Sequence, residues 1–208
     1  CRRQYANRCG VGRTLSETPE NTGTVALPRS RWRDAGLMAL AMMAADQLCK
    51  WWFLRVLYGF EGQITRQDWY PPIDVAPFFK LVMVWNRGVS FGLGNTDGDW
   101  QPYVLSGLAV LIVAVLLNWL RGTADRWSVF AIGAVIGGAL GNIIDRVRFG
   151  AVADFFHFYI GDYAWPAFNI ADSCIVVGVM ILLWRSFMQS GDTRAPVKND
   201  TGNTEQTS

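Results

Sequence analysis

Four long runs of apolar residues alternate with more polar connections and dominate the pattern of the chain. They cover residues 35–53, 103–120, 127–144 and 169–187. Each run is close to the ~20 helical residues that cross the hydrocarbon core of a bilayer. The pattern therefore predicts an all-α membrane protein with four transmembrane helices. A composition that is 51% hydrophobic agrees with that class.

Charged residues distinguish the four predicted helices from one another. The second and third runs contain none, whereas the first holds Asp46 and Lys50 and the fourth holds Asp172 and Arg185. Ionisable residues are costly inside a bilayer, so they usually have a partner or a function. Asp46 and Lys50 are four residues apart, which places them on one helical face and predicts a structural ion pair.

The third run carries small residues at a regular spacing. Gly133, Gly137 and Gly141 recur every four residues. Such a stripe gives a helix a smooth face, and it predicts close packing against a neighbouring helix.

The distribution of Lys and Arg predicts how the helices are oriented. With both termini in the cytoplasm, the inner side carries twice as many Lys and Arg residues as the outer side. Arg29, Arg31 and Arg33, just before the first helix, contribute to this excess. Short positively charged loops stay on the cytoplasmic side. Residues 54–102 and 145–168 are then expected to face outward.

Polar segments flank the helices. Residues 1–30 and 189–208 are predicted to be disordered polar tails around a four-helix membrane domain at residues 31–188. In the first outer connection, the β-prone run KLVMVW is followed by residues typical of tight turns. A small extracytoplasmic β element is therefore expected between the first and second helices.

Neither a metal nor another cofactor is predicted. The four cysteines show no CxxC spacing, and the single histidine, His157, has no second His or Cys near it in the sequence. The net charge of +2 gives no indication of a nucleic-acid partner.

Two aspartates are expected to meet at the outer membrane face. Asp172 begins the fourth helix in FNIADS, and Asp154, in GAVADFFHF, follows the outer end of the third helix. The surrounding Phe and Ile residues make ionisation of either carboxyl costly. Two close carboxyls share a proton, so one acts as base and the other as acid, as in an aspartic protease. Alternatively, Asp172 only caps a helix that begins at Asn169.

The sequence resembles the bacterial lipoprotein signal peptidases, also called signal peptidase II. The resemblance rests on five blocks in order: DQLCK at 46–50, NRGVSFGL at 86–93, GGALGNIIDR at 137–146, VADFF at 152–156 and FNIADS at 168–173. It implies an aspartic endopeptidase of the bacterial inner membrane that removes the signal peptide of a prolipoprotein, just before a diacylglyceryl-modified cysteine. The implied partners are the lipidated prolipoprotein and membrane lipid, and no cofactor is implied.

The same resemblance implies roles for individual residues. Asp154 and Asp172 are expected to be catalytic. The surrounding substrate site is expected to contain Asn86, Asn142, Arg146 and Asn169, with Asn169 also supporting the two aspartates. For Arg146 there is a simpler alternative, which is an ion pair with Asp145 or with lipid phosphate.

A small proton-coupled membrane transporter or channel is the alternative function. Intramembrane acids such as Asp46, Asp154 and Asp172 also serve as proton relays. Transporters, however, often contain inverted repeats. Here two acids gather at one membrane face and the sequence shows no internal repeat, which favours the peptidase.

Overall fold

The computed structural model describes residues 29–88 and 100–192. Most of the two predicted tails, and residues 89–93 of the NRGVSFGL block, lie outside these described residues. In chain order the elements are α1 (Arg29–Trp51), the π-helix η1 (Trp52–Leu57), β1 (Ile73–Ala76), β2 (Phe79–Asn86), α2 (Gln101–Leu120), α3 (Arg126–Phe149), β3 (Val152–Ile160), β4 (Tyr163–Ala164) and α4 (Ile170–Asp192). The first helix begins slightly before residue 31 and the last ends slightly after residue 188.

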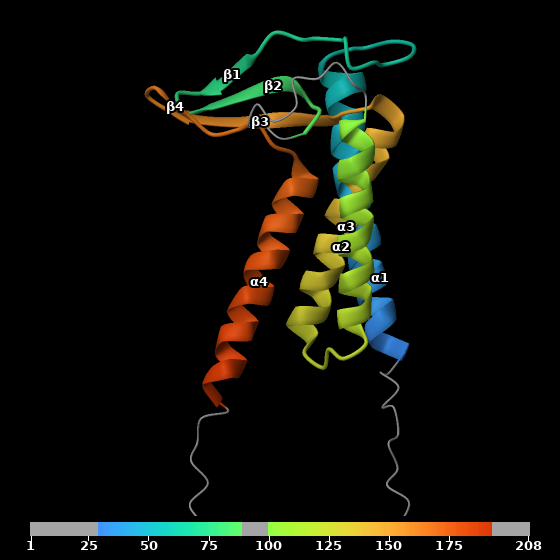
Figure 1. Cartoon of the computed structure of the whole chain (residues 1–208). Helices are drawn as coiled ribbons and strands as arrows, with labels where there is room; N and C mark the ends of the chain where they lie inside the picture. Colours follow the sequence, from blue (N-terminus) through green and yellow to red (C-terminus); the bar gives the residue numbers. More distant parts are fainter. Residues whose placement is uncertain (1–28, 89–99, 193–208) are drawn as a thin grey trace, which may run out of the picture.

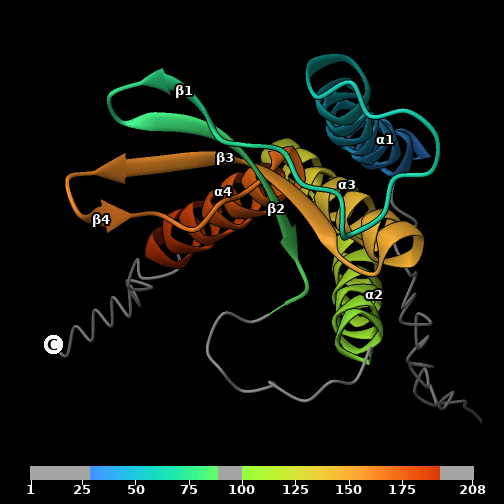
Figure 2. The same ribbon diagram turned by 90° about the horizontal axis from the view of Figure 1, so that it is seen from above.

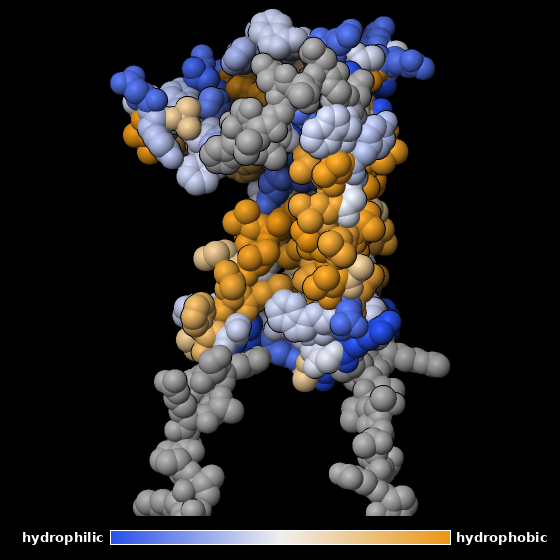
Figure 3. All heavy atoms as spheres, in the orientation of Figure 1, coloured by the Kyte–Doolittle hydropathy of each residue, from blue (hydrophilic) through white to orange (hydrophobic). Residues whose placement is uncertain are grey.

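Three helices of the described chain are long and apolar enough to cross a membrane, namely α2, α3 and the Ile170–Met188 part of α4. The helix α1 occupies the first predicted span, but charged residues near both of its ends lower its hydropathy. The prediction of membrane-spanning helices is thus confirmed for three of the four. Figure 3 shows a band of apolar side chains across the visible face of the bundle, between two more polar ends, which suits the hydrocarbon core of a bilayer.

The helix α3 lies at the centre of the bundle and packs against α1, α2 and α4. Its glycines allow this close approach. A Cβ atom on Gly133 would lie 2.6 Å from the carbonyl oxygen of Ala35 in α1, and one on Gly141 would lie 2.6 Å from Oδ2 of Asp46. Any larger residue would force α1 and α3 apart. The predicted packing face of the third helix is therefore confirmed, and α1 is the helix that covers it.

A four-stranded antiparallel sheet, in the order β1-β2-β3-β4, lies across one end of the bundle (Figures 1 and 2). The predicted β element between the first two helices is confirmed, but it supplies only β1 and β2. The strands β3 and β4 come from the connection between α3 and α4, which the sequence analysis did not assign to a sheet. The start of β3 is buried on both faces, so its sequence has no alternation of apolar and polar residues to reveal a strand.

Aromatic side chains hold the sheet against η1, the π-helix that continues α1. The ring of Phe53 stacks on that of Phe155 in β3, with centroids 4.4 Å apart. Tyr58 adds its ring to the same cluster, and its hydroxyl donates to the carbonyl oxygen of Val82 in β2 at 3.1 Å. This aromatic cluster forms a core of its own and fixes how β2 and β3 lie over the end of the helices. It therefore also positions the polar residues of β3.

Candidate active site

Asp154 projects from the central strand β3, opposite Val84 of β2, and is only 1% exposed. In the sequence this residue was expected at the outer end of the third helix, but it belongs to the sheet that follows that helix. Its two carboxyl oxygens have different donors. Oδ1 accepts from Nδ2 of Asn169 at 2.7 Å, and Oδ2 accepts from Nδ2 of Asn86 at 3.1 Å. Asp154 is therefore held from both sides by carboxamides.

Asp172 lies in the first turn of α4 and takes part in a helix cap. Oδ1 of Asn169 accepts from the backbone N–H of Asp172 at 2.9 Å, and Oδ2 of Asp172 accepts from the backbone N–H of Asn169 at 3.3 Å. This reciprocal pair is a capping box. The capping interpretation is therefore geometrically correct, but the cap uses only one of the two carboxyl oxygens of Asp172. The other, Oδ1, accepts from Nδ2 of Asn142 in α3 at 2.8 Å.

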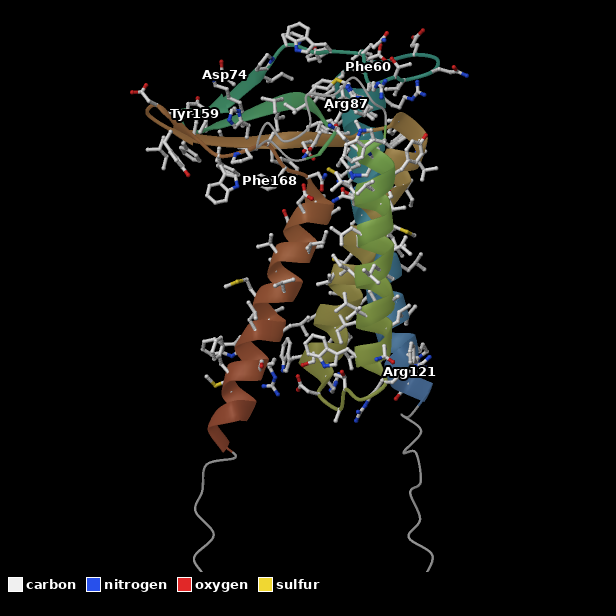
Figure 4. All side chains as sticks on the ribbon, viewed as in Figure 1. Phe60, Asp74, Arg87, Arg121, Tyr159 and Phe168 are labelled. Atoms are coloured by element: carbon white, nitrogen blue, oxygen red, sulfur yellow. The ribbon has the colours of Figure 1, made fainter. Side chains whose placement is uncertain are left out.

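The start of α4 is tied directly to β3, and this brings the two aspartates into one site. Backbone hydrogen bonds join Phe168 to Phe156 in both directions, at 2.9 and 3.0 Å. Figure 4 shows Phe168 at the junction between the sheet and α4. Asn169, the next residue, therefore stands beside Asp154 and can bridge to α3, where its Nδ2 donates to Oδ1 of Asn142 at 3.2 Å.

Burial changes the acidity of Asp154. Removal from water raises the pKa of this carboxyl to about 7, and the nearby negative charge of Asp172 acts in the same direction. The hydrogen bonds from Asn86 and Asn169 oppose the shift, but they do not cancel it. Asp154 therefore holds a proton up to about neutral pH.

The predicted ion pair between Asp46 and Lys50 is confirmed, with Nζ of Lys50 2.8 Å from Oδ2 of Asp46. Both side chains are buried, at 4% and 0% exposure. The structure adds a second acid that sequence reasoning missed, since Nζ of Lys50 also lies 2.7 Å from Oδ2 of Asp145 in α3. A signal for it existed, because Asp145 is four residues after Gly141 and so lies on the helix face that packs against α1.

This buried ion cluster is linked to both aspartates of the site. Nζ of Lys50 lies 3.4 Å from Oδ1 of Asn142, the residue that donates to Asp172. In addition, the carboxylate of Asp145 accepts from the backbone N–H of Ala153 at 3.2 Å, directly before Asp154. Lys50 and Asp145 therefore help to orient the residues that hold the two aspartates.

Arg146 does not adopt its simpler alternative role as the ion-pair partner of Asp145, because Asp145 pairs with Lys50. Its Nη1 donates to the carbonyl oxygen of Asn142 at 3.4 Å. Its Nε is buried and has no hydrogen-bond partner among the described residues. A buried donor without a partner is costly, and it indicates a place where a bound molecule supplies the acceptor.

A hollow of about 520 Å³ opens beside Asp154. Asn86, Arg87 and His157 line it together with the segment 164–167. Figure 4 shows Arg87 where β2 ends above the bundle. His157 therefore borders the site. Among the described residues, no cluster of side chains suited to binding a metal ion occurs.

These features define a class of protein. It is a small helical membrane protein with a sheet at one end of its bundle. Where sheet and bundle meet, it has two hydrogen-bonded carboxyls, of which that of Asp154 is buried and that of Asp172 is partly buried. A family model described as signal peptidase (SPase) II matches residues 38–188. This chain belongs to the signal peptidase II family, and it is a membrane peptidase.

Similar proteins agree with this assignment. The chain is 41% identical over 154 residues to a lipoprotein signal peptidase of Methylocella silvestris, a match that covers 74% of this chain and 85% of the relative. It is 40% identical to a lipoprotein signal peptidase of Methylorubrum extorquens, over 81% and 94% of the two chains. Family membership favours the peptidase over the alternative of a proton-coupled transporter or channel.

The fold has also been seen in a solved structure. A bacterial membrane enzyme, determined by the in meso method at 2.3 Å resolution, superposes with a TM-score of 0.63 at 24% identity. The match covers 83% of this chain and 97% of the other. At this identity the likeness concerns the fold.

Proposed function

We propose that Asp154 and Asp172 are the catalytic pair with which this signal peptidase cleaves prolipoproteins. The cut falls just before a diacylglyceryl-modified cysteine and releases the signal peptide. One observation carries the proposal: two carboxyls from different elements, β3 and α4, enter a single hydrogen-bonded network through Asn169 and Asn142. A helix cap alone does not account for Asp154, which caps no helix.

The raised pKa of Asp154 supports an assignment of the two roles. Asp154 carries the proton, and ionised Asp172 is the base that takes a proton from water while the water oxygen attacks the scissile carbonyl carbon. Asp154 gives its proton to the carbonyl oxygen. The tetrahedral intermediate then collapses: the C–N bond breaks and the amine nitrogen leaves with the proton that Asp172 had accepted. One hydroxyl of the intermediate returns a proton to Asp154 as the carboxyl product forms, which restores the pair. No metal ion is required for this sequence of proton transfers.

The surrounding residues hold this pair and receive the substrate. Asn142 and Asn169 position the two carboxyls, and Asn86 holds Asp154 from the side of the hollow. Arg146 is the proposed contact for a substrate carbonyl or a lipid head group, because its buried Nε lacks an acceptor within the described chain. Guanidinium groups suit both ligands, since they present several donors in a rigid plane.

The proposed membrane placement has four spans, with α1 as the first. Its two intramembrane charges, Asp46 and Lys50, face the bundle interior and neutralise each other, so they do not meet lipid. Its outer face instead exposes apolar side chains such as Leu37, Leu40 and Leu48. A helix of this kind can span a bilayer although its mean hydropathy is low.

The proposed orientation places both termini and the turn between α2 and α3 in the cytoplasm of a bacterial cell, with the sheet and the active site at the outer face of the inner membrane. The Lys and Arg distribution supports it. Residues 31–188 are then the peptidase domain, and the segments on either side are polar tails. Labelling of an Ala124→Cys variant from outside intact cells would contradict this orientation.

The experiment that tests the function compares two precursors. Purified protein in detergent is incubated with a diacylglyceryl-modified prolipoprotein and with the same precursor lacking the lipid. We expect cleavage of the lipidated precursor only, with the lipidated cysteine as the new amino terminus. Equal cleavage of both precursors would contradict lipid-dependent specificity, and no cleavage of either would contradict the proposed activity.

A pH profile tests the assignment of acid and base. Because Asp154 must be protonated to act as the acid, and its pKa is raised to about 7, we expect the initial rate to fall as pH rises above about 7. The decline approaches about tenfold per pH unit once the carboxyl is mostly ionised. If Asp154 were the base, the rate would instead rise through this range.

A further inference from the structure

The carboxylate of Asp46 pairs with Lys50, and it also contacts the helix that carries one of the two aspartates of the site. Its Oδ1 accepts from the backbone N–H of Ala171, in the first turn of α4, at 3.0 Å. Ala171 is fully buried and directly precedes Asp172. Asp46 therefore links α1 to the start of α4, at the residue before Asp172.

A glycine of α3 leaves the space for this link. The helix α3 lies between α1 and α4 (Figure 2). A Cβ atom on Gly141 would lie 2.6 Å from Oδ2 of Asp46 and 3.5 Å from Cβ of Ala171. Asp46 thus reaches α4 across the face of α3 at Gly141. Any larger residue at this position would need the space that the carboxylate occupies.

Asp145 makes the corresponding contact for the other aspartate of the site. Its Oδ2 accepts from the backbone N–H of Ala153 at 3.2 Å, and Ala153 directly precedes Asp154. Ala153 is buried as well. A buried backbone N–H needs an acceptor within the protein, and here a carboxylate supplies it. Each aspartate of the site therefore follows a residue whose backbone amide is held by a buried carboxylate.

Two side chains of α1 connect these two carboxylates. Nζ of Lys50 lies 2.8 Å from Oδ2 of Asp46 and 2.7 Å from Oδ2 of Asp145, so both carboxylates share one ammonium group. Nε2 of Gln47 also donates to both carboxylates, at 3.2 and 3.0 Å. Hydrogen bonds to charged groups are short and strong, so these two links hold the carboxylates at one distance from each other.

We propose that Asp46 and Asp145 are positioning residues, which set the separation of Asp154 and Asp172 by holding the backbone directly before each of them. The two side chains of α1 that bridge the carboxylates keep β3 and the start of α4 in one relative position. Both positioning residues act through the backbone and not on the reacting atoms. The inference rests on the proposed catalytic role of Asp154 and Asp172. A misplacement of about 1 Å between reacting groups can cost about 10²-fold in rate, so this separation matters for the reaction.

The test compares Asp46→Asn with Asp46→Leu. Both changes remove the same negative charge and the ion pair with Lys50, but Asn keeps an oxygen that can accept from the backbone N–H of Ala171. In Asp46→Leu we expect kcat for a lipidated precursor to fall by about 10²-fold, with KM changed by less than about threefold. In Asp46→Asn most of this loss should be absent. Rates are measured per folded molecule, on monodisperse protein well below its thermal midpoint, so that a loss of stability alone does not lower kcat.

Gly141→Ala and Gly133→Ala form a matched pair, which tests the same link if Asp46→Leu fails to fold. Each adds one methyl group to the face of α3 that packs against α1, and each new Cβ atom would lie 2.6 Å from an atom of α1. At Gly141 that atom belongs to the carboxylate of Asp46, and at Gly133 it is the carbonyl oxygen of Ala35. We therefore expect kcat to fall by about tenfold or more in Gly141→Ala and by less than about twofold in Gly133→Ala.

Hydrogen exchange at the amide of Ala171 provides a measurement that needs no cleavage. Exchange should be faster in Asp46→Leu than in Asp46→Asn, since only leucine leaves this N–H without its acceptor. Equal kcat in the two Asp46 variants, or an equal loss in the two glycine variants, would contradict the positioning role and leave the cluster with a role in stability alone. Near-normal turnover by Asp154→Asn, assayed in parallel, would instead overturn the proposed function and the positioning role with it.

Discussion

Asp154→Asn is expected to reduce the initial rate of cleavage of a lipidated precursor by about 10²–10⁴-fold while the protein remains folded. An amide cannot donate the carboxyl proton to the scissile carbonyl oxygen, so the acid is lost. The shape is nearly preserved, and Asn can still accept hydrogen bonds from Asn86 or Asn169. Because the buried carboxyl is costly to ionise, its removal should not lower stability at pH 8. The measurement uses equal amounts of monodisperse protein in detergent.

Asp172→Asn provides the companion variant with a different expectation for stability. It also removes the base, so activity should fall in the same range. As in Asp154, both oxygens of Asp172 accept hydrogen bonds, one from Asn142 and one from the capping box of Asn169. In Asp154→Asn, the loss of one acceptor is offset by removal of a buried carboxyl that is costly to ionise. Replacing one acceptor of Asp172 by an NH₂ group should cost about 1 kcal/mol of stability. The thermal midpoint should therefore fall for Asp172→Asn and hold for Asp154→Asn.

The double variant separates a catalytic pair from two independent residues. Members of one catalytic unit are not additive, so the double variant should be scarcely slower than either single variant. Near-normal turnover by either single variant would falsify the mechanism. It would leave Asp172 with its role in the capping box alone.

Lys50→Met is expected to give the largest loss of stability, about 3–5 kcal/mol. Lys50 is the shared partner of Asp46 and Asp145, and all three side chains are buried. Without the ammonium group, two carboxylates are left in the bundle with no ion-pair partner at this position. The free energy of unfolding in mild detergent is the measurement. A loss below about 1 kcal/mol would contradict the view that the cluster holds α1 against α3.

Two further variants test whether the burial of these charges causes the loss of stability. Adding Asp46→Asn and Asp145→Asn to Lys50→Met should recover much of the stability, because the buried charges are then gone. Arg185→Met breaks a pair with Asp125 whose side chains are 32% and 19% exposed. Since solvent screens this pair, its loss should cost only about 1 kcal/mol or less. A similar loss in Arg185→Met and Lys50→Met would show that burial is not the cause.

The helices and the family were predictable because their signals are local. An apolar run of about 20 residues predicts a membrane helix from its own composition. The spacing of Asp46 and Lys50, or of Gly133 and Gly141, follows from the geometry of a single helix. Each signal lies within one element, and the contacts confirm the ion pair and the packing face. The sheet was only half predicted, since the buried part of β3 shows no alternation of apolar and polar residues and is apolar except for Asp154.

The arrangement of the site depended on tertiary structure. From the sequence, both aspartates were expected at the same membrane face. Helix capping and pairing with Asp154 were alternative roles for Asp172. The structure combines them, because the two oxygens of one carboxyl point to different partners. Asp145 was missed as a partner of Lys50 for a related reason, since the two residues lie 95 positions apart and meet only where α3 packs against α1.

The sequence by itself therefore determined the membrane class, the positions of the helices, the ion pair within α1 and the candidates for the catalytic residues. Tertiary structure alone decided which of those residues touch. It placed Asp154 on a central strand, joined it to Asp172 through Asn169 and Asn142, and buried it deeply enough to raise its pKa. The physical reason is that hydrogen bonds and desolvation between distant segments depend on how whole elements pack, and no local pattern of residues encodes that packing.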